Sequence, residues 1–244
     1  MARKTYYDTE TVFEQPSEEL LQSGARETAR RARARGQVLE PVVVRGRIIA
    51  HSWWGRAWCE NLERYADYES RLERGKRYLR TGAVVDLKIL PGKVTAKVQG
   101  RRKNPYKVEI RISPVNEERL DRIMEMCGSR IGDLDRLLKG DFPEEFKGSF
   151  LGEEGLFPTP REIAFGCSCP DWALMCKHVA AVLYGIAVRF DEDPLLFFRL
   201  RGIDVDRFVT VTLQNSAEQM LANADVDSPR ILRFDGWEGL FGIL

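Results

Sequence analysis

Four potential metal ligands lie within twelve positions of this 244-residue chain and constrain its fold more than any other feature. They follow the pattern C-x-C-x6-C-x-H and comprise Cys167, Cys169, Cys176 and His178. The chain has five cysteines and two histidines, so three of the five and one of the two gather in this segment. Zn²⁺ favours thiolate and imidazole ligands in a closed tetrahedral set where its role is structural. The cluster therefore predicts a structural Zn²⁺ site.

The cysteines of this cluster are expected to be reduced rather than paired in disulfides. The first ten residues, MARKTYYDTE, lack the apolar stretch of a secretory signal, and no apolar run is long enough to span a membrane. We therefore expect a cytoplasmic protein, in which clustered thiols more often bind metal than form bridges. A bridge between Cys167 and Cys169 would also close a strained ring. Buried free thiols are the alternative to a metal site.

The spacing of the ligands predicts the local structure of residues 161–190. A short strand should open this segment and lead to the first two cysteines, and a turn at Pro170 should bring their sulfur atoms together. Cys176 and His178 are two positions apart, which does not place them on one helix face. Cys176 should therefore precede a helix that runs over residues 177–189. The expected unit is a β-turn-α finger closed by one ion.

The ligand pattern, C-x-C, a variable gap and C-x-H, resembles the SWIM zinc finger family at all four positions. Members of that family commonly have an apolar helix after the histidine, as this chain does. Residues 52–63 and 71–112 also resemble the N-terminal region of prokaryotic SWIM-containing proteins. The resemblance implies zinc binding, a role in nucleic-acid or protein interaction, and a Swi/Snf-type ATP-dependent helicase as a partner. Residues 195–244 carry no comparable motif.

Charge is unevenly distributed along the chain, although the net charge is only +1. Residues 1–110 contain 23 Lys and Arg against 14 Asp and Glu, whereas residues 111–244 contain 15 against 23. A basic half suggests a polyanionic partner, and the alternative is that the halves attract each other or expose solvated charges. We predict a basic α+β domain over residues 1–140. An acidic region with the finger and an apolar C-terminal tail should follow over residues 141–244.

Three segments of alternating hydrophobicity predict an antiparallel three-stranded sheet. They span residues 83–90, 93–99 and 106–112, with a tight turn at Pro91-Gly92 and a longer loop over 100–105. One face should pack on the core and leave the other wet and mostly basic. Candidate nucleic-acid contacts on this face and its loop are Lys93, Lys97, Lys107, Arg111, Arg101, Arg102 and Lys103. A lysine-rich face is also common without any partner, because it discourages edge aggregation.

Helical periodicity surrounds the predicted sheet. Helices are expected over residues 17–35, 53–65, 70–80 and 116–139, and the tryptophans of the second should pack in the core. The segment FVTVTL, residues 208–213, has the composition of a strand. The predicted fold class is therefore α+β. It comprises an antiparallel three-stranded sheet with helices, then a helical region that carries the zinc-stapled β-turn-α finger.

The sequence has no common catalytic motif that would mark an enzyme. A phosphate-binding G-x-x-x-x-G-K-[ST] loop, H-E-x-x-H and G-x-S-x-G are all absent. We therefore expect no enzymatic activity and no small-molecule substrate; an uncharted nuclease is the alternative. The expected function is that of a zinc-binding, nucleic-acid-binding accessory protein that acts with an ATP-dependent helicase or other DNA or RNA machinery. The competing function is a protein–protein adaptor that uses the finger and the apolar tail.

Overall fold

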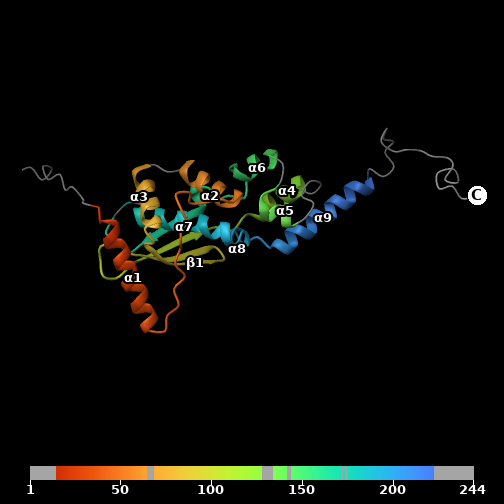
Figure 1. The fold of residues 1–244 in the computed structure, drawn as a ribbon. Coiled ribbons are helices and arrows are strands. Elements are labelled where there is room, and N and C mark those ends of the chain that lie inside the picture. The colour runs from red at the N-terminus through yellow and green to blue at the C-terminus, as the bar shows by residue number, and fades with distance from the viewer. Residues whose placement is uncertain are drawn as a thin grey trace, which may run out of the picture.

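A sheet with helices packed along it forms the centre of the molecule (Figure 1). The computed structural model describes residues 15–64, 69–127, 134–141, 144–171, 173 and 175–222. The strands are β1 (Val84–Leu90), β2 (Lys93–Val98), β3 (Tyr106–Ile112) and β4 (Ile163–Cys167). The helices are α1 (Glu18–Ala34), α2 (Trp53–Arg64), α3 (Glu69–Arg80), α4 (Glu117–Cys127), α5 (Leu134–Lys139), α6 (Glu144–Leu151), α7 (Lys177–Glu192), α8 (Leu195–Leu200) and α9 (Val205–Ala222), with a 3-10 turn at Pro160–Glu162.

The sheet has four antiparallel strands in the order β1-β2-β3-β4, so the prediction of three strands was wrong. The three predicted strands are confirmed within one or two residues. The fourth, β4, is the strand expected to open the finger, and it pairs with the outer edge of β3. In that pairing Cys167 lies opposite Val108. The segment with the candidate metal ligands is therefore continuous with the sheet rather than a separate small unit.

Helix α7 is the central element of the core. Twelve of its residues are buried, and it packs against α2, α3 and the sheet. A helix that is apolar on all sides suits such an enclosed position. Glycines permit the close approach of its neighbours: a Cβ at Gly75 of α3 would lie 2.5 Å from the Cβ of Ala180. A Cβ at Gly55 of α2 would lie 2.8 Å from the carbonyl oxygen of Ala187.

The tryptophan stripe of α2 packs in the core, as predicted from its spacing. Trp54 and Trp58 are both fully buried. The indole N–H of Trp54 donates to the carbonyl oxygen of Leu137 at 3.1 Å, and that of Trp58 donates to the carbonyl oxygen of Leu183 at 2.9 Å. Each indole thus buries its ring and satisfies its one donor, which a buried tryptophan requires.

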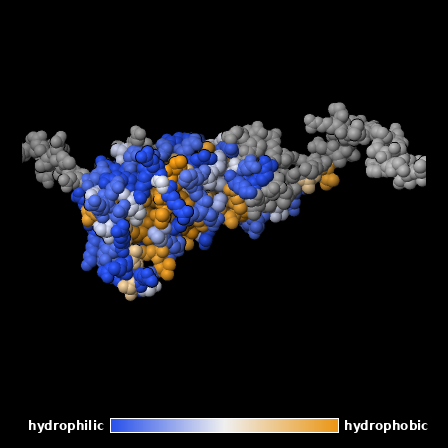
Figure 2. Space-filling model, in the orientation of Figure 1, coloured by the Kyte–Doolittle hydropathy of each residue, from blue (hydrophilic) through white to orange (hydrophobic). Residues whose placement is uncertain are grey.

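The connection between α1 and α2 exposes apolar side chains. Figure 2 shows an apolar band on the face that residues 37–50 cross, where Val38, Val43 and Ile48 are exposed. The backbone of this connection bonds to the edge of β1 through the amide of Val42 and the carbonyl of Val84. No helix within the described residues combines the length and the apolar character needed to cross a membrane.

The strand-like segment FVTVTL is helical, which contradicts the expectation from its composition. It lies within α9, a helix that continues through the helix-forming residues after it and packs against α4. Tertiary contacts override the modest strand preference of valine and threonine here. The predicted apolar C-terminal tail, residues 223–244, lies outside the described residues. The division of the chain at residue 140 stays a prediction, although elements from both sides of it share one core cluster.

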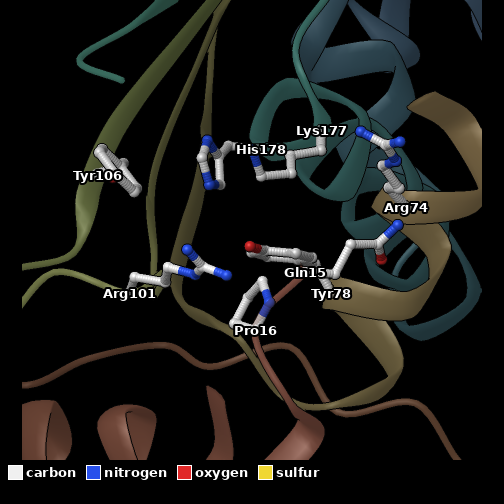
Figure 3. Close-up of a pocket in the computed structure, with 8 residues that line it drawn as sticks. All are labelled: Gln15, Pro16, Arg74, Tyr78, Arg101, Tyr106, Lys177 and His178. Carbon is white, nitrogen blue, oxygen red and sulfur yellow. The ribbon is translucent and has the colours of Figure 1, made fainter. Parts of the chain in front are cut away.

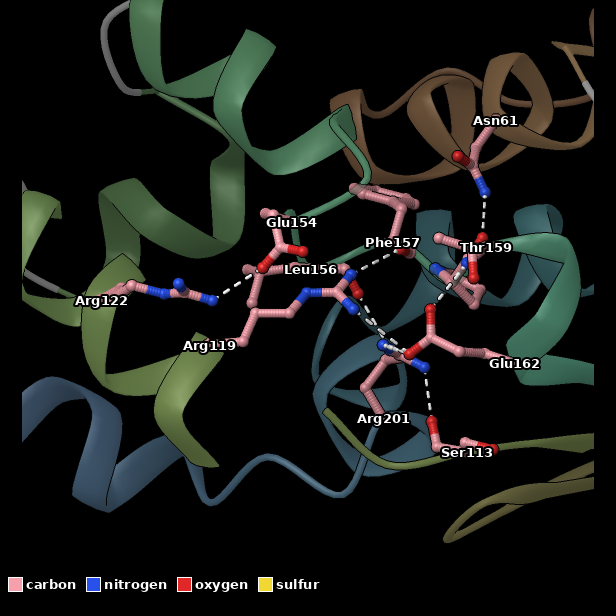
Figure 4. Close-up of polar contacts among 11 residues, drawn as sticks. Asn61, Ser113, Arg119, Arg122, Glu154, Leu156, Phe157, Thr159, Glu162 and Arg201 are labelled. Carbon is pink, nitrogen blue, oxygen red and sulfur yellow. Dashed lines mark hydrogen bonds and ion pairs between the residues drawn. The ribbon is translucent and has the colours of Figure 1, made fainter. Parts of the chain in front are cut away.

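A buried ionic network fixes the segment that leads into β4 (Figure 4). Arg201 is fully buried and donates to Glu162 at 2.9 Å, to the carbonyl of Leu156 at 2.9 Å and to the carbonyl of Ser113. Arg119 of α4 donates to the same Glu162 oxygen at 3.3 Å. Burial opposes ionisation of Glu162, but these donors and a backbone amide lower its pKa below the ordinary 4.5. One carboxylate therefore joins three parts of the chain immediately before the metal-ligand strand.

Candidate metal centre

The four predicted ligands converge at the junction between the sheet and the central helix. The nearest potential ligand atoms of Cys167, Cys169, Cys176 and His178 all lie within 4.8 Å of one another. The Nδ1 atom of His178 is 4.0 Å from the sulfur of Cys167 and 3.9 Å from that of Cys176. The three cysteines are free thiols, and the cluster ranges from half-buried to buried.

Strand β4, the loop after it and the start of α7 position the four candidate ligands. Pairing of β4 with β3 fixes Cys167. Past the strand end, the amide of Ser168 donates to the carbonyl oxygen of Lys107 at 3.0 Å, and the amide of Lys107 donates to the hydroxyl of Ser168 at 2.9 Å. The following loop is tied to α3 by an ion pair of 3.1 Å between Asp171 and Arg71. Cys176 is the N-cap of α7, and His178 stands in its first turn, as the sequence predicted.

The donor set and its spacing fit a single metal ion. Metal–sulfur bonds of about 2.3 Å and metal–nitrogen bonds of about 2.0 Å place neighbouring ligand atoms of a tetrahedral site roughly 3.5 to 3.8 Å apart. Nδ1 of His178 is 3.9 and 4.0 Å from two of the sulfur atoms, and no pair of ligand atoms is more than 4.8 Å apart, so only a small contraction is needed to reach that geometry. The donor set of three thiols and one imidazole, with no disulfide among these four residues, is thus compatible with a metal site.

The closeness of the sulfur atoms makes the pKa values of the three thiols differ. A hydrogen bond from Cys167 lowers the pKa of Cys176, and His178 acts in the same direction against the effect of burial. The same partnership raises the pKa of Cys167, while burial raises that of Cys169. The pKa values of the three thiols are thus shifted in different directions within one cluster. A bound cation would stabilise all three thiolates, because it supplies the positive charge that the cluster lacks.

The imidazole of His178 is enclosed between two tyrosines. Its ring lies 4.4 Å from the ring of Tyr106 and 5.3 Å from that of Tyr78, in tilted and edge-on arrangements. The ring presents Nδ1 to the sulfur atoms, and its Nε2 is buried without a hydrogen-bond partner among the described residues. A histidine that ligates metal through one nitrogen usually donates from the other. The unpartnered Nε2 therefore marks a place for an acceptor.

The basic loop (Arg101, Arg102 and Lys103) adjoins this histidine and is held in shape by α1. The side chain of Gln99 donates to the carbonyl of Arg102 at 2.7 Å and accepts from Thr28 at 2.7 Å. Arg31 donates to the carbonyl of Lys103 at 2.6 Å. These bonds use backbone oxygens of the loop, so its three exposed cationic side chains project from a fixed backbone.

The other predicted nucleic-acid contacts lie on the sheet face, and three of them form ion pairs with acidic side chains. Lys93 and Arg111 both pair with Glu109, each at 2.7 Å, and Lys97 pairs with Asp86 at 2.9 Å. Lys107 is exposed beside Ser168. The structure thus brings Arg101 to the metal cluster and sets three of the sheet cations in local ion pairs.

Sequence reasoning missed several residues around the cluster. Tyr78, Tyr106, Arg74 and Lys177 surround His178 but come from α3, β3 and α7. Lys177 is next to a ligand and Tyr106 opens a predicted strand, yet neither position carries a local pattern that indicates a site. Only the packing of α3 and β3 against the start of α7 brings them together.

Comparison with known proteins gives one informative similarity. The chain is 38% identical over 156 residues to the uncharacterized protein Rv2102 of Mycobacterium tuberculosis (strain ATCC 25618 / H37Rv). The match covers 63% of this chain and 56% of that protein, so the chain spans about half the length of its relative. No protein-family model matches the chain, and no solved structure matches it.

Proposed function

We propose that this chain is a zinc-binding, nucleic-acid-binding accessory protein of the SWIM type, acting with an ATP-dependent helicase or other nucleic-acid machinery. The observation that carries the proposal is the nearness of the Cys/His cluster to the basic loop, since Arg101 and His178 line the same cavity (Figure 3). Both features lie at one end of the sheet, where Gly100 and Tyr106 bring the loop against the imidazole of His178. Four protein ligands leave a bound zinc no open position, so its role is structural.

The shape of the basic loop supports a role in binding phosphate groups. Hydrogen bonds from Gln99 and Arg31 hold its backbone before any ligand arrives. A cation on an ordered backbone loses less conformational freedom on binding than one on a flexible segment. Phosphate contacts of this kind position a nucleic acid without reading its sequence. We therefore propose affinity for DNA or RNA with little preference among bases.

A protein–protein adaptor is the competing function, and the apolar band over residues 37–50 favours it. Val38 is 82% exposed and Ile48 is 61% exposed, and an exposed apolar patch often marks an interface. The two functions differ in their response to salt. Binding through several phosphate contacts weakens steeply between about 50 and 200 mM salt, whereas apolar docking does not.

The proposed function is tested by metal analysis followed by a binding panel. Elemental analysis of freshly purified protein should find one zinc per chain. Fluorescence anisotropy with labelled single- and double-stranded DNA and RNA, at about 50 and 200 mM salt, should detect binding that falls with salt. Protein without bound transition metal, or without affinity for any nucleic acid at low salt, would refute the proposal.

A further inference from the structure

The sheet has an open face, on the side away from the central helix α7 (Figure 1). Alternate residues of β2 and β3 are buried, and those between them are half-buried or exposed. The strand register places Lys97 of β2 opposite Lys107 of β3. Past the end of β4, Ser168 continues this row through its hydrogen bonds with Lys107. A row of polar side chains therefore crosses the strands at one end of the open face.

Helix α1 forms a wall beside this row. Two neighbouring hollows of about 300 and 350 Å³ lie there. The first is lined by α1, by residues that follow it and by the row, and the second is lined by the row and the end of β4. Lys97 and Lys107 line both hollows, so the two form one groove from α1 to Gly166 and Cys167. The groove thus ends at the candidate metal ligands.

Two cations of the groove have no acidic partner among the described residues. They are Arg35, at the C-cap of α1, and Lys107, and both side chains are exposed. Arg31 of the first hollow is already paired with an acidic residue of its own helix. The two acidic residues of the second hollow, Asp86 and Glu109, already pair with lysines at 2.9 and 2.7 Å. The charge left over in the groove is therefore positive and favours an anionic occupant.

A single phosphodiester strand fits the groove in charge and in shape. Neighbouring strands of a sheet are about 4.8 Å apart, so the row from Lys97 to Ser168 extends roughly 10 Å. At a rise of about 3.4 Å per nucleotide, this length takes more than one nucleotide. The hydroxyl of Ser168 accepts from the amide of Lys107 at 2.9 Å, which leaves its own proton free to donate to a phosphate oxygen. A stiff duplex would rest on the rims, whereas one strand can follow a recessed basic track.

We infer that this groove binds the backbone of one strand of DNA or RNA, with Arg35 and Lys107 as its phosphate contacts. The inference rests on the proposed function for the class of ligand and deepens it, because it makes the ligand single-stranded and adds α1 to the interface. It also gives the metal cluster a part in binding. Cys167 lines the groove, so an ion held by the cluster would fix β4 as the far wall.

Fluorescence anisotropy with labelled single-stranded DNA, single-stranded RNA and a duplex of the same sequence tests the inference. Arg35→Gln and Lys107→Gln each remove one phosphate contact. Each should weaken single-strand binding about eightfold at about 50 mM salt and about threefold at about 200 mM. Arg33→Gln is the matched control, because it removes the same charge from the same helix but Arg33 does not line the groove. Its effect should stay within about twofold.

A second variant fills the groove without changing its charge. Gly166 is exposed, does not have a positive φ, and a Cβ there would meet its nearest neighbour, the carbonyl oxygen of Glu109, at an ordinary 3.7 Å. Phenylalanine is also a good strand residue. Gly166→Phe should therefore keep the fold, as circular dichroism checks, and weaken single-strand binding severalfold by occupying the path of the strand.

The outcomes separate this inference from the proposed function. Nucleic-acid binding that is unchanged in Arg35→Gln and Lys107→Gln, or that Arg33→Gln weakens equally, would overturn the groove and leave the proposed function standing. Tighter binding of the duplex than of either single strand would overturn the choice of ligand. Absence of binding to every oligonucleotide at low salt would overturn both.

Discussion

Replacing Cys176 with serine separates the contribution of the metal from that of packing. Cys176 is 1% exposed and is the N-cap of α7, the helix at the centre of the core. Serine is a good N-cap residue, so the helix start is preserved or improved. A serine hydroxyl does not replace a thiolate as a zinc ligand. The substitution therefore removes one of the four proposed ligands while leaving the local backbone intact.

The expected magnitude follows from linkage between zinc binding and folding. A ligand held at a free concentration 1,000 times its dissociation constant stabilises the folded state by about 4.1 kcal/mol. Loss of tight binding in Cys176→Ser should remove about 4 kcal/mol of unfolding free energy at that zinc concentration. For a chain of this size that corresponds to a melting temperature lower by about 8 to 16 °C. In excess chelator the two proteins should differ by no more than about 1 kcal/mol.

Urea unfolding with added zinc and with chelator, together with elemental analysis, measures both quantities. Cys59→Ser is the control, because burial raises the pKa of the Cys59 thiol to about 12 and it lies outside the cluster. That variant should keep one zinc and the full response to chelator. Full zinc occupancy in Cys176→Ser would refute the assignment of this ligand. A stability difference that persists in chelator would show that packing, not metal, causes the loss.

Three further predictions test the surface, the helix packing and the ionic network. Replacing all three basic-loop side chains with alanine should weaken nucleic-acid binding and lower the salt slope by about 0.9 per lost phosphate contact, as gel shifts at several salt concentrations would measure; unchanged affinity at low salt would remove the loop from the interface. Gly75→Ala should cost about 2 kcal/mol in urea unfolding, because its Cβ would lie 2.5 Å from that of Ala180. The matched control, Gly148→Ala in α6, has nothing within 4 Å and should gain up to about 1 kcal/mol, so equal effects would contradict the packing argument. Glu162→Gln should cost about 3 kcal/mol, because it leaves the buried Arg201 without its counter-charge. The pKa of Glu162 is lowered in the folded state, so the contribution of its carboxylate to stability is present above pH 4.5 and is lost as the pH falls through the folded-state value. The unfolding free energy should therefore depend less on acidic pH in the variant. Identical curves of unfolding free energy against pH would exclude this role.

The sequence was informative where structure depends on neighbouring residues. The alternation of β1 to β3 and the turn at Pro91-Gly92 are local, and Gly92 adopts the positive φ of 66° that such a turn requires. The four candidate metal ligands were likewise predicted from spacing within one short segment, and the structure brings them together.

The sequence was uninformative where structure depends on distant partners. Strand β4 has five residues, including Gly166, and its pairing with β3 follows from the whole fold rather than from its own pattern. FVTVTL forms a helix, and its first residue, Phe208, is buried beside Phe198. The side chains around His178 come from the segment before α1, from α3, from the basic loop, from β3 and from α7, which no sequence window contains.

The long sequence separation between β3 and β4 affects how the protein should be handled. The loop formed by residues 113–162 must close before β4 can pair with β3. Closing such a long loop is slow compared with hairpin formation. Until it occurs, the outer backbone groups of β3 remain open to strands from other molecules. An ion bound by both Cys167 and the start of α7 would hold β4 in place. Zinc supply during expression should therefore govern the yield of soluble protein, and chelators in the lysis buffer should promote precipitation.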